Sequence, residues 1–150
     1  KKHPDAIFKI AGKGIPKERK MKWEKIKGIV VLGFIKSVDE LYNEAKVVVV
    51  PIYYGSGTNI KILEAMAMKK TVVTSNFSAK ALQPDLRDGQ NILIANNNED
   101  FAKKIITSLE DDVLNNSIAI QAHKTVNENF SFQSFSGKIQ KVLLKNSSCE

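Results

Sequence analysis

Short runs of apolar and β-branched residues alternate along this chain with stretches in which apolar residues recur every three or four positions. The apolar runs lie at residues 6–11, 29–35, 47–52, 71–74 and 91–95. Runs of this length and composition are typical of strands that are buried on both faces of a sheet. The pattern therefore predicts a series of strands with helices between them.

The stretches between and after these runs carry helix signals. Ser37 and Glu40 have the spacing of a capping box, which predicts that a helix starts there. Asn98 is the predicted cap of a later helix, because apolar residues follow it at helical spacing. Two more helices are predicted, over residues 113–129 and about 133–144, with no strand after them.

This order of elements predicts the fold class. A connection between parallel strands needs about a dozen residues or more and usually takes a helix. Strands that alternate with helices therefore predict an α/β protein, in which helices cover both faces of a doubly wound parallel sheet. The helices near the end of the chain are expected to form a helical tail.

Length and composition fit one such unit. The chain has 150 residues, of which 43% are hydrophobic, so we expect one domain over residues 1–150. It begins with Lys1 rather than Met and runs directly into a strand-like segment, so we expect that upstream sequence is missing. The apolar runs are too short to span a membrane, and the single Cys149 has no partner for an internal disulfide. These features predict a soluble protein in a reducing compartment.

The net charge of +7 suits an anionic partner. That partner could be a nucleotide diphosphate, a nucleic acid or an anionic membrane surface, and charge alone does not choose among them. The densest basic stretch, residues 17–27, is predicted to be the solvated face of a helix.

A glycine-rich turn between a predicted strand and a predicted helix is the best candidate for a site. It follows the run at 47–52 and contains Gly55 and Gly57. In an open α/β sheet, ligands bind outside the carboxyl ends of the strands. The glycines let the backbone approach a ligand, and the unpaired amides at the helix start, near Thr58 and Asn59, can donate to phosphate oxygens. The turn therefore suits a diphosphate.

Lys61 and Glu64 follow this turn and lie on the same side of the predicted helix, because they are three residues apart. The lysine can reach the same phosphates. A carboxylate suits a neutral diol such as ribose, whose hydroxyls donate to it. The arrangement thus describes a nucleotide site, while an ordinary ion pair on the helix surface stays an alternative at this point.

Residues 61–74 resemble the donor-site signature of the family 4 retaining glycosyltransferases. Their sequence is KILEAMAMKKTVVT. Weaker matches occur in the family's order at residues 3–5, 11–14, 32–34, 39–42 and 87–94. The resemblance covers nearly the whole chain, and it implies one Rossmann-like half of a GT-B fold that binds the nucleotide-sugar donor.

The resemblance also implies roles for individual residues. Glu64 would accept the ribose hydroxyls, and Lys61 would stabilise the leaving phosphate. The diphosphate loop would consist of Ser56, Gly57, Thr58 and Asn59. The residues against the base would be Phe34 and Ile35, and those of a further loop of the cleft would be Gly12 and Gly14.

Further expectations concern the intact protein. The resemblance implies a retaining hexosyltransferase without a metal or other cofactor, whose substrate is a nucleotide sugar such as a UDP- or GDP-sugar. Its own N-terminal domain, absent here together with the first strand of this domain, would bind a glycan or lipid-linked acceptor. Surface polysaccharide or glycan synthesis in the cytoplasm, at the inner face of the membrane, is the expected setting. The isolated chain is expected to bind a donor without completing transfer.

Three positions depart from the family's usual residues. Ser56 stands eight residues before Glu64, where many members carry a second glutamate near the donor sugar. A subgroup that lacks this glutamate often has arginines where Tyr53 and Asn59 stand here. These departures affect donor affinity and donor identity.

Two other classes of protein are alternatives. An epimerase or a non-catalytic nucleotide-binding module could share Lys61 and Glu64 without an acceptor site. A basic nucleic-acid-binding domain is a more distant alternative, because Glu64 would repel a polyanion and no face interleaves basic and aromatic residues. We therefore expect no nucleic acid among the partners.

Overall fold

The computed structural model describes residues 3–55, 59–134 and 136–137. The chain divides into two compact units, Lys1–Leu41 and Tyr42–Glu150. Each is described by itself below, and they are called unit 1 and unit 2. In the part of the chain that the structure describes, no helix combines the length and apolar composition that a membrane crossing requires.

Unit 1 is a parallel β-α-β arrangement. Strand β1 (Phe8–Ala11) pairs with β2 (Ile29–Gly33), starting from the pair Phe8 and Ile29. Helix α1 (Lys17–Glu24) connects them and buries none of its residues, so the prediction that the basic stretch is a solvated helical face is confirmed over this helix.

The sheet of unit 2 consists of strands β3 (Val47–Val50), β4 (Thr71–Ser75) and β5 (Leu93–Ala95). They are parallel and lie in the order β3-β4-β5. Helix α3 (Ile60–Ala67) connects β3 to β4. The short helix α4 (Asn76–Ala79) and the 3-10 turn η1 (Lys80–Leu82) begin the connection to β5.

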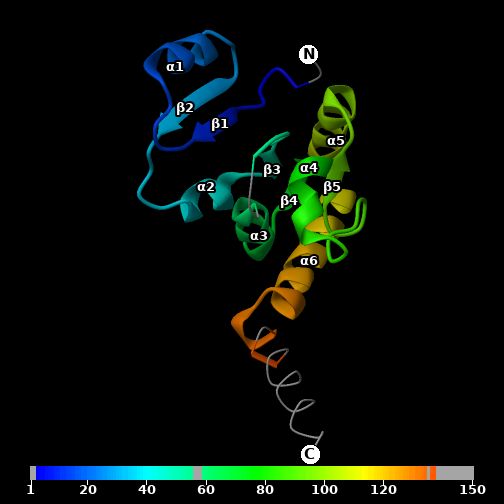
Figure 1. Ribbon diagram of the computed structural model, residues 1–150. Helices are drawn as coiled ribbons and strands as arrows, with labels where there is room; N and C mark the ends of the chain where they lie inside the picture. Colours follow the sequence, from blue (N-terminus) through cyan, green and yellow to red (C-terminus); the bar gives the residue numbers. More distant parts are fainter. Residues whose placement is uncertain (1–2, 56–58, 135, 138–150) are drawn as a thin grey trace, which may run out of the picture. The chain divides into compact units, whose positions relative to one another are not determined.

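Successive residues of these strands point to opposite faces of the sheet, and each face has its own hydrophobic core. On one face Val72 and Ile94 pack with Ile62 and Met66 of α3. On the other face the neighbouring strand residues pack against two helices near the end of unit 2, α5 (Asn98–Glu110) and α6 (Asp112–Asn129). Figure 1 shows these helices around the sheet. The predicted doubly wound α/β fold is confirmed.

A single residue, Asp111, separates helices α5 and α6. Asp111 ends α5 and also caps α6, because its carboxylate accepts a hydrogen bond from the amide of Leu114 at 2.9 Å. The cap of α5 is Asn97, whose side chain accepts from the amide of Asp100 at 2.9 Å. The prediction of Asn98 as the cap was wrong by one residue, because Asn97 has the extended backbone of a cap.

The predicted capping box is also corrected. Helix α2 runs over Asp39–Glu44, and the hydroxyl of Ser37 accepts from the amide of Asp39 at 3.2 Å, not from Glu40. The predicted helix at 113–129 is confirmed as α6. Of the last predicted helix, residues 133–134 and 136–137 are helical, and the remainder lies outside the described residues.

Buried polar groups hold α6 to the amino ends of β3 and β4. The hydroxyl of Thr71 donates to the backbone oxygen of Asn115 at 2.7 Å. The side chain of Asn115 donates to the carbonyl of Lys46, the residue before β3, at 3.3 Å. This part of α6 therefore lies at the edge of the sheet opposite to the carboxyl ends of the strands.

The core on the α3 face supports a stability prediction. Ile62 is fully buried, whereas Ile60, on the same helix, is 62% exposed. Replacing Ile62 by Ala should lower the free energy of unfolding by about 2–5 kcal/mol, because it removes buried methyl groups and leaves a cavity. Ile60→Ala should change it by less than about 0.5 kcal/mol. Urea unfolding of both variants checks this, and equal losses would contradict the assigned core.

Candidate functional site

The loop that follows β3 is held at the carboxyl edge of the unit 2 sheet. The carbonyl of Ile52, two residues beyond β3, accepts a hydrogen bond from the hydroxyl of Ser78 at 2.9 Å and a second one from Ser75. Both donors are buried and belong to the end of β4 and to α4. Two donors satisfy the lone pairs of this carbonyl, so the loop enters the glycine-rich turn from a fixed point.

Helix α3 begins directly after this turn. Asn59 precedes its first residue but makes no side-chain cap, and its amide instead faces the carbonyl of Ser78 at 3.5 Å. The first turn of α3 contains no acidic residue and carries Lys61. Its amides and its dipole therefore favour an anion at this end of the helix. Of the predicted diphosphate loop, Ser56, Gly57 and Thr58 lie outside the described residues.

Lys61 and Glu64 are both exposed on α3. Among the described residues no ion pair within 4.0 Å joins them, although their spacing would allow one. The ordinary ion pair on the helix surface, which the sequence left open, is therefore not formed. A cation and a carboxylate lie on one helix without neutralising each other.

Glu64 instead accepts a hydrogen bond from a tyrosine. The hydroxyl of Tyr42, on α2, donates to Oε2 of Glu64 at 3.2 Å. Burial, the charge of Glu64 and this hydrogen bond together raise the pKa of Tyr42 from 10.0 to about 12. At neutral pH the phenol is therefore protonated and acts as the donor. Sequence reasoning assigned Tyr42 no role, because no local spacing connects residues so far apart.

The other predicted site residues belong to unit 1. Gly12 and Gly14 follow β1, and Phe34 and Ile35 follow β2, so both pairs lie at the carboxyl edge of the same parallel pair of strands. The amide of Gly12 donates to the carbonyl of Gly33 at 2.8 Å, so it is used within unit 1. Gly14 has a φ of 78°, which favours glycine, and Phe34 is 69% exposed.

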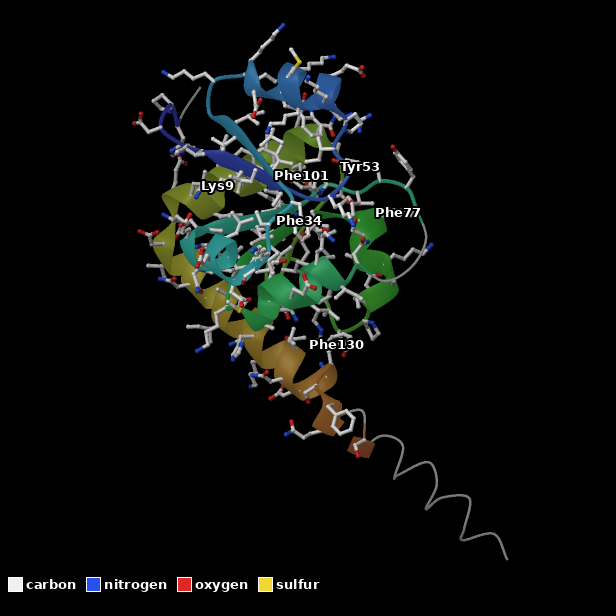
Figure 2. The ribbon with its side chains drawn as sticks, turned by 90° about the vertical axis from the view of Figure 1, so that its left-hand side faces the viewer. Lys9, Phe34, Tyr53, Phe77, Phe101 and Phe130 are labelled. Atoms are coloured by element: carbon white, nitrogen blue, oxygen red, sulfur yellow. The ribbon has the colours of Figure 1, made fainter. Side chains whose placement is uncertain are left out.

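The loop after β3 and helix α4 in unit 2 carry aromatic side chains. The hydroxyl of Tyr53 donates to Oδ1 of Asn98, at the start of α5, at 3.1 Å. Tyr54 is 87% exposed, and Phe77 of α4 is 44% exposed. Tyr53 and Phe77 are labelled in Figure 2. Tyr53 thus joins the loops at the carboxyl ends of β3 and β5, a link that the sequence did not indicate.

A polar cavity of about 460 Å³ lies elsewhere, between α6 and the loop before β5. Asn91 lines it, and its side-chain groups are already bonded to the backbone of Asp85 and Arg87 and to the hydroxyl of Thr125. The polar groups of Asn91 are therefore satisfied within the protein. No group of three His, Cys, Asp or Glu side chains in the described part of the chain is placed to hold a metal ion.

Several solved structures are similar to this chain in fold. HepE from Anabaena, in complex with UDP, has 18% sequence identity and a TM-score of 0.79 over 95% of this chain. A glycosyltransferase from Rickettsia africae ESF-5 has 20% identity and a TM-score of 0.78 over 99% of this chain. TarM has 24% identity and a TM-score of 0.75 over 90% of this chain. The chain spans 42%, 42% and 28% of these three proteins, respectively. These likenesses confirm the Rossmann-like fold expected for one half of a GT-B protein.

The family itself follows from the sequence. No curated protein matches the chain. The model of the family described as Glycosyl transferases group 1 matches residues 1–111, which include unit 1, the glycine-rich turn and α3. The resemblance seen in the sequence is therefore confirmed as far as the glycosyltransferase family, and this chain belongs to the group 1 glycosyl transferases.

Proposed function

We propose that this chain is the donor-binding part of a glycosyltransferase that moves a sugar from a nucleotide diphosphate sugar to an acceptor. The observation that carries the proposal concerns two charged side chains of α3, the helix that follows the glycine-rich turn. Lys61 and Glu64 are exposed and form no ion pair with each other, so both charges stay available to a ligand. Family membership supports the same reading.

Each charge has a distinct proposed role. Lys61, together with the amides at the start of α3, binds the diphosphate, and it stabilises the negative charge that develops on the leaving phosphate. Glu64 accepts hydrogen bonds from the ribose hydroxyls. Asn59 and the residues 56–58 complete the diphosphate loop in this proposal. In this proposal the backbone at Phe34 and Ile35 contacts the base, and Gly12 and Gly14 belong to a further loop of the donor cleft.

The reaction that we propose is retaining transfer of a hexosyl group without a metal. The leaving phosphate assists attack by the acceptor on the same face of the sugar, and the protein contributes mainly electrostatic stabilisation of the leaving group. The lysine and the helix amides supply the positive charge that a divalent ion supplies in other transferases.

We further propose that an N-terminal domain of the same protein binds a glycan or lipid-linked acceptor in the cytoplasm, in surface polysaccharide or glycan synthesis. One solved structure of TarM from S. aureus contains UDP together with Fondaparinux and alpha-GlcNAc-glycerol. HepE was solved with UDP. These complexes make UDP the first nucleotide to test with this chain.

The proposal predicts saturable binding of a nucleoside diphosphate, measured by calorimetric titration of the chain with UDP, GDP and ADP and with their sugars. Lys61→Ala and Glu64→Ala should each weaken binding by about tenfold to a hundredfold, because each removes a hydrogen bond to a charged group.

The matched controls are Lys124→Ala and Glu128→Ala. These two residues form an exposed ion pair on α6 at 3.9 Å, beside the cavity at the amino edge, and their loss should leave the Kd unchanged. The assignment fails if a short DNA duplex binds while no nucleotide does at millimolar concentration, or if the control variants weaken binding as much as the site variants.

A further inference from the structure

The partner of the Glu64 carboxylate is a neutral hydroxyl. An ionised carboxylate only accepts hydrogen bonds, and its two oxygens offer about four lone pairs. The hydroxyl of Tyr42 approaches Oε2 at 3.2 Å, and the structure gives Glu64 no ion pair with a described lysine, arginine or histidine. No described cation therefore neutralises the carboxylate, and Oε1 stays available to a further donor.

The tyrosine is held where it can orient that carboxylate. Its ring is half-buried and packs against the core on the α3 face. The backbone next to it is fixed as well, because Nζ of Lys70 donates to the carbonyl of Asn43 at 3.0 Å. Lys70 follows the end of α3, so the segment that carries Tyr42 is anchored to the region that carries Glu64. The hydroxyl thus reaches Glu64 from a rigid ring.

A free glutamate on a helix surface samples several rotamers, and a ligand must select one of them. A donor on one oxygen restricts these rotamers in advance and so lowers the entropy lost on binding. Two ribose hydroxyls need a carboxylate whose plane is fixed, because both must reach oxygens of one group. A neutral donor can supply this orientation without competing for the negative charge, which a lysine would neutralise.

We propose that Tyr42 is a positioning residue that orients Glu64 toward the ribose hydroxyls of the nucleotide, and that this orientation lets the site distinguish ribose from a sugar without hydroxyls. The inference rests on the proposed binding of ribose by Glu64. It assigns Tyr42 no contact with the nucleotide.

The contact itself is testable by titrating the tyrosines, followed by ultraviolet absorbance. The chain has three tyrosines, and the pKa of Tyr42 is raised to about 12. Because this pKa is raised in the folded protein, the protonated phenol of Tyr42 contributes to the stability of the fold. The contribution is complete below pH 10.0, the ordinary pKa of tyrosine, and is lost as the pH rises toward about 12. In Tyr42→Phe the absorbance step near pH 12, which belongs to Tyr42, should disappear. In Glu64→Gln it should move down but stay above 10.0, because burial, the largest cause, remains. An unmoved step in Glu64→Gln would overturn the inference.

The function of the contact is tested by comparing UDP with 2′,3′-dideoxy-UDP in calorimetric titrations of the chain. Wild type should bind UDP about tenfold more tightly than the dideoxy form. Glu64→Ala, which removes both acceptor oxygens, should lose this preference. Tyr42→Phe, which keeps the ring, should lose most of the preference, because it weakens the binding of UDP and not that of the dideoxy form. Tyr53→Phe is the matched control, since it removes a hydroxyl bonded to Asn98 and not to Glu64, and it should keep the preference.

Failure of the inference and failure of the proposed function give different results. If Tyr42→Phe weakens the binding of UDP and of the dideoxy form equally, or changes neither, while Glu64→Ala loses the preference, Tyr42 does not position Glu64 and the proposed function stands. If wild type shows no preference for UDP, or if Glu64→Ala keeps the preference, Glu64 does not bind ribose, and the proposed role and the inference fall together.

Discussion

The burial of β4 on both faces is the constraint on which the arrangement of unit 2 depends. All residues of Thr71–Ser75 are buried, including three with hydroxyl groups. A buried hydroxyl without a partner is costly, so each of these groups must find an acceptor inside the protein. Thr71 bonds to α6, Thr74 to β3 and Ser75 to the loop after β3. A single strand thereby determines where a helix, a neighbouring strand and a loop lie.

The candidate site depends on the last of these bonds. Because Ser75 and Ser78 hold the carbonyl of Ile52, the turn before α3 starts from a fixed place at the carboxyl edge. The helix that follows has a basic side chain and no acidic one in its first turn. The positive end of α3 and the carboxylate of Glu64 therefore lie at different places along the same helix. Such a separation suits a ligand that is anionic at one end and rich in neutral hydroxyls at the other.

The strands and the long helices could be predicted from the sequence because their signals are local. A buried strand is a short run rich in apolar and β-branched residues, and a cap lies a few residues from its donor. The α5 cap was misplaced because residues 96–98 are all asparagine, and only the backbone shows which side chain reaches Asp100. Helix α4 and η1 are too short for their periodicity to be seen.

The candidate site could be predicted only in part, for a similar reason. Lys61 and Glu64 follow the glycine-rich turn directly, so their place on the first turns of α3 could be predicted from spacing alone. The absence of an ion pair between them could not, because it depends on side-chain geometry. The bonds from Tyr42 to Glu64 and from Tyr53 to Asn98 join residues that are far apart in the chain, and they form only when the elements that carry these residues come together in the fold.

The double role of Asp111 limits how this fold can vary in length. One residue ends α5 and caps α6, and its amide also donates to the carbonyl of Thr107 at 2.9 Å. An inserted residue would separate these two functions and would rotate α6 relative to α5. Leu114 and Ile118 of α6 share a core with α5, whereas Ala122, later in α6, packs in the core on the α3 face. Changes in length that are tolerated during evolution, and points chosen for circular permutation or domain insertion, should therefore avoid this junction and fall in exposed loops.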